Sequence, residues 1–208
     1  MKRAIVTLSC AVGCAVAPAI AQPTHGGWLI EVVGDPVSPS NPTTTVRVSA
    51  YFPSHLWALN YGGFDLIGAD SNAVFSNFLL PAPLGPRPPG VHGCVRLLVG
   101  NNGSGRVDDI SFLQINVVGC FANPGNPLPI FEAQWTTNDF SPRQVQLETL
   151  NTPEFHVFRT PQATFETIDL VATQQFRHGS AVIQVIPAPT VVAVFAFGLV
   201  ARARRRRV

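Results

Sequence analysis

The stretch Thr43-Thr44-Thr45-Val46-Arg47-Val48-Ser49-Ala50-Tyr51-Phe52 decides the fold class of this 208-residue chain. From Val46 onward, apolar and polar side chains alternate with a period of two, which is the pattern of a strand with one buried and one wet face. The same alternation recurs at residues 28–33, 131–136 and 144–149. These segments predict an all-β domain.

Shorter runs extend this prediction along the chain. Further strands are expected at 63–67, 73–78, 95–99, 112–118, 155–158, 164–170 and 181–186. Segments rich in Pro, Gly and Asn predict loops at 36–42, 81–90, 101–105 and 123–129. A weak helical pattern is confined to residues 110–114. Nine or ten short strands in one domain predict a two-layer antiparallel β-sandwich of jelly-roll or immunoglobulin/cohesin-like type.

The first 21 residues have the order of a secretory signal peptide. Lys2-Arg3 precedes an apolar run over Ala4–Val16, and Ala19 and Ala21 supply the small-x-small pattern that signal peptidase accepts. We therefore expect a signal helix, passage through the export translocon and cleavage after Ala21. Lipid attachment at Cys14 is the alternative.

The last segment, residues 186–208, has three parts. It begins with the motif Pro187, Ala188 and Pro189. The apolar run that follows spans about eleven residues, about 17 Å of helix at about 1.5 Å per residue, which is short for a bilayer core of about 30 Å. The residues of this short membrane helix are Val191, Val192, Val194, Phe195, Phe197, Leu199 and Val200. The basic cluster, expected on the cytoplasmic side, is Arg202, Arg204, Arg205, Arg206 and Arg207.

This order of motif, short apolar helix and terminal arginines resembles the PEP-CTERM family of sorting signals. The resemblance implies transient attachment to the envelope membrane, recognition and cutting by an exosortase, and a final place at the cell surface or in extracellular matrix. Ala188 stands where the family usually has Glu. The alternative is a basic tail that binds nucleic acid or acidic lipid, and the export signal at the other end of the chain argues against it.

The domain between the two signals, residues 22–185, is acidic. Two of the fourteen basic residues belong to the signal peptide and five to the tail, so seven remain against twelve acids and the formal charge is −5. A negatively charged domain does not attract the phosphates of DNA or RNA, so the charge gives no reason to expect nucleic-acid binding. About 164 residues suffice for one complete hydrophobic core.

Two cysteines, Cys94 and Cys120, remain in the exported domain. An even number of cysteines in an oxidising compartment predicts one disulfide. Closing a loop of about 27 residues stabilises a fold by about 3–4 kcal/mol in the chain-entropy model. The alternative is a pair of buried free thiols.

The segment from Thr43–Phe52 into Gly62-Gly63-Phe64-Asp65-Leu66 resembles cohesin and carbohydrate-binding sandwiches. In those domains an early alternating strand precedes a strand that carries an aromatic and an acidic residue. The resemblance implies a binding module. Trp57, beside Tyr61 in a loop-like stretch, is the best candidate for a sugar-stacking surface, whereas Trp135 fits a core position.

The sequence contains no recognisable catalytic motif. The five histidines do not lie at a recognisable spacing from a nucleophile and an orienting acid. The oxygen-rich segments Asp70-Ser71-Asn72 and Asp108-Asp109 read as turns, with calcium as the alternative. We therefore predict a protein without cofactor and without enzymatic activity, a structural or binding module of the cell surface or matrix. The alternative is a secreted carbohydrate-binding or carbohydrate-active protein, with surface polysaccharide as its partner.

Overall fold

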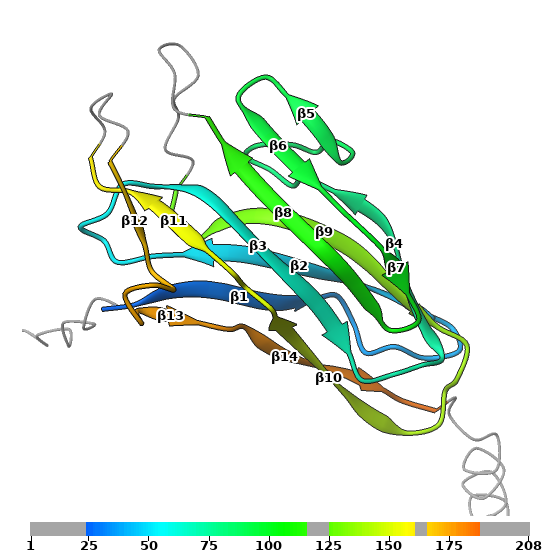
Figure 1. The fold of residues 1–208 in the computed structure, drawn as a ribbon. Helices are drawn as coiled ribbons and strands as arrows, with labels where there is room; N and C mark the ends of the chain where they lie inside the picture. The colour runs from blue at the N-terminus through cyan, green and yellow to red at the C-terminus, as the bar shows by residue number, and fades with distance from the viewer. Residues whose placement is uncertain (1–23, 116–124, 161–165, 188–208) are drawn as a thin grey trace, which may run out of the picture.

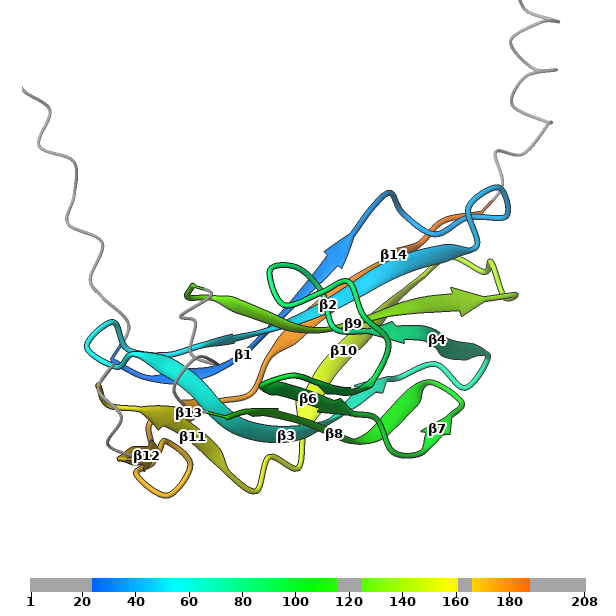
Figure 2. The same ribbon diagram turned by 90° about the horizontal axis from the view of Figure 1, so that it is seen from above.

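The protein folds as two β-sheets packed face to face (Figures 1 and 2). A computed structural model describes residues 24–115, 125–160 and 166–187. The signal peptide, the tail from Ala188 onward and Cys120 therefore lie outside the described residues. No helix within the described ranges is long and apolar enough to cross a membrane.

One sheet has five strands in the order β13-β1-β2-β9-β4. Neighbouring strands are antiparallel, except that β13 runs parallel to β1. The strands are β1 (Gly26–Val33), β2 (Thr43–Tyr51), β4 (Ala73–Leu79), β9 (Leu128–Thr137) and β13 (Phe176–Arg177).

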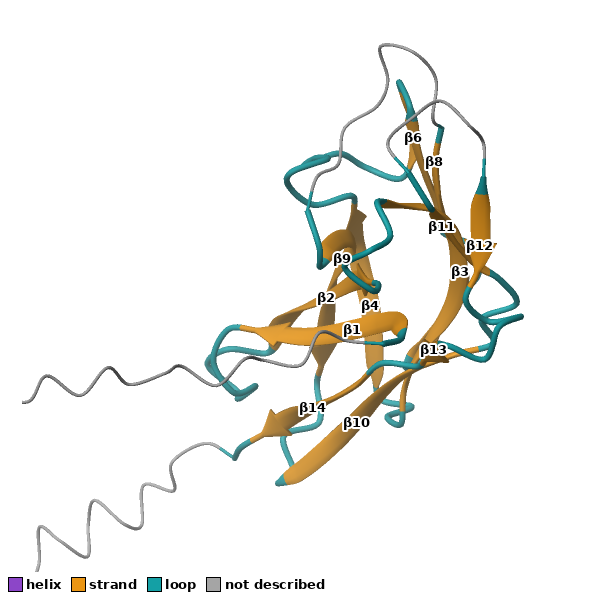
Figure 3. Cartoon of the chain, turned by 90° about the vertical axis from the view of Figure 1, so that its left-hand side faces the viewer, coloured by secondary structure: helices purple, strands orange, loops and turns teal. Residues whose placement is uncertain are grey.

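The other sheet has nine strands. Its main path is β12-β11-β3-β8-β6-β5, with β10 between β3 and β14, and β7 beside β8. The strands are β3 (Ala58–Gly68), β5 (Gly90–His92), β6 (Val95–Leu98), β7 (Asn102–Gly103), β8 (Arg106–Gln114), β10 (Arg143–Leu150), β11 (Phe155–Phe158), β12 (Thr167–Asp169) and β14 (Ser180–Val185). Figure 3 shows how this sheet curves around the five-stranded one.

The core lies between the sheets and is rich in aromatic rings. Trp28 of β1 is 1% exposed, and its ring centroid lies 4.8 Å from that of Phe64 and 4.7 Å from that of Phe155. The indole Nε1–H donates to Thr152 Oγ1 at 2.9 Å, so the polar atom of this large ring is satisfied. Gly62 is required beside it, because a Cβ there would lie 2.7 Å from Trp28 Cη2.

The all-β, two-sheet prediction is confirmed, and several local predictions are wrong. Residues 110–114 are not helical: they belong to β8, where Ile110 and Phe112 are buried and Ser111 faces outward. The expected loop at 101–105 contains β7, and the loop-like stretch around Trp57 ends where β3 begins at Ala58. The parallel pairing of β13 with β1 is an exception to the expected antiparallel order.

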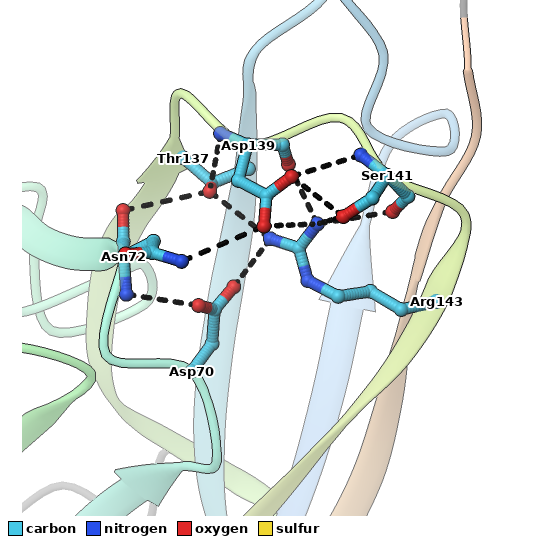
Figure 4. Close-up of polar contacts among 6 residues, drawn as sticks. All are labelled: Asp70, Asn72, Thr137, Asp139, Ser141 and Arg143. Carbon is cyan, nitrogen blue, oxygen red and sulfur yellow. Dashed lines mark hydrogen bonds and ion pairs between the residues drawn. The ribbon is translucent and has the colours of Figure 1, made fainter.

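A partly buried ion pair ties the two sheets together at one end of the sandwich (Figure 4). Arg143, at the start of β10, donates from Nη2 to Asp70 Oδ2 at 2.6 Å, and Asp70 lies in the turn between β3 and β4. The same guanidinium reaches the turn after β9 through the carbonyls of Asp139, at 2.7 Å, and Ser141, at 3.0 Å. One side chain therefore holds both turns in place.

Candidate binding face

The outer face of the nine-stranded sheet carries a row of side chains from neighbouring strands. In β3, Phe64 and Leu66 point into the core, so Tyr61, Gly63 and Asp65 face outward. The register extends this row across the sheet. Outward residues paired with them are Leu113 and His156 opposite Tyr61, Ser111 opposite Gly63, and Leu150 opposite Asp65.

A hollow of about 270 Å³ lies in the middle of this face. Gly63 forms its floor: a Cβ there would enter the space and approach the Ile110 carbonyl to 3.3 Å. The rim includes Tyr61 on one side and Asp65 on the other. The full lining is Tyr61, Gly63, Phe64, Asp65, Asp109, Ile110, Ser111, Asn151 and Pro153.

Two backbone irregularities fix the carboxylate of Asp65, which is only 8% exposed. Its Oδ1 accepts the Asp109 N–H at 2.9 Å, and its Oδ2 accepts from Asn151 Nδ2 at 2.6 Å. Asp109 and Asn151 both have positive φ, 56° and 51°, a conformation that Asp and Asn tolerate better than other side chains do. The β3–β8 register shifts between Phe64 and Leu66, and bulges of this kind are enriched beside functional sites.

Other polar groups around the hollow have no partner among the residues that the structure describes. Within the parts of the chain that the structure describes, the Tyr61 and Ser111 hydroxyls and the Asp109 carboxylate make no hydrogen bond. Asp65 keeps lone pairs beyond the two it uses. Two carboxylates and two hydroxyls give the hollow an excess of acceptors, so it is suited to a ligand that brings donors or positive charge.

The tryptophans lie away from this hollow. Trp28 and Trp135 are 1% and 0% exposed, and the core position predicted for Trp135 is confirmed. Trp57 is half-buried and its backbone N–H donates to the Phe158 carbonyl at 2.8 Å. Tyr61, which lies four residues after Trp57 in the sequence, contributes an aromatic side chain to the hollow instead.

Of the two oxygen-rich segments that suggested calcium, Asp70-Ser71-Asn72 lies between β3 and β4 as a turn, whereas the prediction of a turn at Asp108-Asp109 is wrong, because both residues belong to β8. Asp70 Oδ1 accepts the Asn72 N–H at 2.9 Å while Oδ2 binds Arg143. Asp108 binds Arg106, and this hydrogen bond is the main reason that the pKa of Arg106 is raised. Across the described ranges, no group of three or more His, Cys, Asp or Glu side chains is placed to hold a metal ion.

Several predicted residues fall outside the described ranges and stay predictions. They are Ala19 and Ala21 of the cleavage site, Ala188 and Pro189 of the sorting motif, and all the residues of the apolar run and arginine cluster. Pro187 is described and exposed. Cys94 is disulfide-bonded, and its pairing with Cys120 stays a prediction.

Known structures share this fold at low sequence identity. A cohesin module from a family 33 glycoside hydrolase of Clostridium perfringens matches with a TM-score of 0.52 and 10% identity over 79% of this chain and 98% of its own. The seventh ScaB type I cohesin of Pseudobacteroides cellulosolvens matches with a TM-score of 0.50 and 13% identity, over 80% and 96%. No protein-family model and no curated protein matches the sequence. The chain therefore has a cohesin-like fold.

Proposed function

We propose that this chain is an exported, non-catalytic binding module that recognises a protein partner through the outer face of its nine-stranded sheet. The observation that carries the proposal is the hollow over Gly63, where an oriented carboxylate, Asp65, lies beside polar groups that have no partner within the described chain. The cohesin-like fold supports it, because the matched structures are by their names modules of larger proteins: one belongs to a glycoside hydrolase and one is the seventh cohesin of ScaB.

The chemistry of the face defines the partner. Asp65 and Asp109 favour a lysine or arginine side chain. A guanidinium or ammonium brings positive charge and several hydrogen-bond donors, and a carboxylate can only accept. Two exposed apolar residues of the same sheet lie beside the polar centre: Leu98 pairs with Ser111, and Leu150 pairs with Asp65. The core of a protein interface is usually apolar and its rim polar, but arginine is among the residues that most often anchor an interface in a central pocket, and the hollow offers such a pocket.

The two ends of the chain determine where this module is located in the proposal. The signal peptide directs export, and the PEP-CTERM-like tail brings the domain to the membrane for processing by an exosortase-type enzyme. The intact mass of protein from the native host, measured without reduction, tests this part. A species from Gln22 to about Pro187 supports export and tail removal, whereas a species that keeps residues 191–208 contradicts processing.

A photo-crosslinking experiment tests the binding face. A photoreactive amino acid replaces Ser111 in the hollow or, as the matched control, Thr45 on the outer face of the five-stranded sheet. We expect a protein adduct in the native host from position 111 only, and its loss when Asp65→Asn is added. Equal adducts from both positions, or none from position 111, contradict the proposal.

A second candidate, binding of a polysaccharide, rests on Tyr61, since a tyrosine beside acids and amides is also a common sugar site. The same experiment separates the two partners. An adduct that proteases digest supports the protein partner. An adduct that only glycosidases remove supports the polysaccharide.

A further inference from the structure

The hairpin formed by β7 and β8 contains the only Asn-Gly step in the sequence, Asn102-Gly103. Both residues are exposed, and the two-residue turn Ser104-Gly105 follows, with Gly105 at φ 68°. This turn chemistry is typical of a tight hairpin. The same dipeptide is chemically labile, because the residue after the asparagine has no side chain to shield its backbone nitrogen.

We infer that Asn102 is a site of spontaneous deamidation that accumulates with the age of the protein. The Gly103 nitrogen, after losing its proton to water, attacks Asn102 Cγ and forms a five-membered succinimide as ammonia leaves. Water then opens the ring at either carbonyl and gives aspartate or isoaspartate. The net change is one water consumed and one ammonia released, with no oxidant or reductant.

The amide that would be lost has a structural role. Asn102 Nδ2 donates to the Phe75 carbonyl at 2.7 Å and so joins the hairpin of one sheet to β4 of the other. The Gly105 N–H donates to the Ala73 carbonyl at 2.8 Å in the same contact. Both bonds cover the free edge of β4, the last strand of the five-stranded sheet.

Deamidation removes the donor from this contact. A carboxylate at position 102 would face the Phe75 carbonyl as a second acceptor, with no hydrogen between the two oxygens. The hairpin would then keep only the Gly105–Ala73 bond and the bridge between Val74 and Ser104 to β4, and a strand edge that is less well covered is a template for pairing with another chain. The modification therefore couples the age of the protein to opening of one sheet edge, independently of the proposed binding face.

The experiment incubates the folded, oxidised protein in mildly alkaline buffer and follows deamidation by peptide mapping that separates aspartate from isoaspartate. We expect both products at position 102, at a rate that rises with hydroxide concentration. Gly103→Ala is the matched control: its Cβ would meet only Arg106 Cγ at 3.5 Å, so the hairpin is kept while the nitrogen is shielded. Asn102→Asp is the product mimic, in which we expect faster amide exchange at Gly105.

The results of this experiment either support deamidation at Asn102 or refute it. Products at position 102 in the wild type that are lost in Gly103→Ala support it. If position 102 reacts in urea but not in the folded protein, the hairpin blocks ring closure and the inference is wrong. Equal rates at other asparagines, or an unchanged rate in Gly103→Ala, also overturn it.

Discussion

Replacing Arg143 by alanine tests how strongly the ends of the two sheets are tied together. The side chain is 22% exposed and its partner Asp70 is 5% exposed, so the ion pair is mostly shielded from water. Arg143→Ala removes the bonds to Asp70, Thr137 and the carbonyls in the turn after β9, and leaves the Asp70 carboxylate with the Asn72 N–H alone. The buried charge then lacks its counter-charge.

The expected cost follows from this geometry. Breaking a fully buried ion pair costs about 3–5 kcal/mol, and the partial exposure of Arg143 reduces this to about 2–3 kcal/mol. For a domain of this size, that is a fall in the melting temperature of about 5–10 °C. Arg106→Ala is the matched control, because its pair with Asp108 is 46% and 26% exposed and water screens it, so its loss should cost much less.

Urea unfolding, followed by the fluorescence of the core tryptophans, measures both variants. Adding Asp70→Asn to Arg143→Ala should recover part of the lost stability, because it removes the unpaired buried charge. If Arg143→Ala costs no more than Arg106→Ala, water reaches Asp70 and the reasoning is refuted. If Asp70→Asn gives no recovery, the arginine acts by packing rather than by charge.

Two further predictions concern the core and the same end of the sandwich. Gly62→Ala should destabilise the fold by about 1–3 kcal/mol in urea unfolding, because the added Cβ would press on Trp28, whereas Gly103→Ala should be nearly neutral. The hydrogen bonds from Ser141 hold the pKa of Asp139 below its ordinary value. The stability that this depressed pKa contributes is present above the pKa of the unfolded state and is lost as pH falls through the pKa of the folded state. An NMR titration of Ser141→Ala should therefore show a higher Asp139 pKa, and the stability of the variant should depend less on acid pH.

Alternating strands were predictable because their side-chain period is local. The apolar residues Val46 and Val48 of the alternating stretch are buried, and β11 spans the residues predicted for it. The helical pattern at 110–114 failed because polarity does not follow burial there: burial alternates along this part of β8, but the apolar Leu113 faces outward and the polar Gln114 is buried. The strand β13 was missed because two residues carry no periodicity.

The candidate site could be predicted only in part. The sequence drew attention to Gly63 and Asp65 through the cohesin-like segment, and to Tyr61 only as the neighbour of Trp57. It gave no sign that Asp109 and Asn151 orient Asp65, because they lie 44 and 86 residues away and depend on positive φ angles at two separate bends. Such a site is set by long-range register, which a pattern with a period of two does not encode.

The two outer faces of the sandwich use their polar side chains differently. On the five-stranded sheet, polar groups bind across strands: Thr43 Oγ1 to Thr136 Oγ1 at 2.8 Å, and Arg47 Nε to Glu132 Oε1 at 2.6 Å. On the nine-stranded sheet, the groups around Gly63 remain available to a ligand. A rigid sheet that presents unsatisfied acceptors loses little entropy on binding, since the strands already fix their positions. The proposed binding role therefore falls to the nine-stranded face, because the cross-strand pairs of the five-stranded face already use their polar side chains.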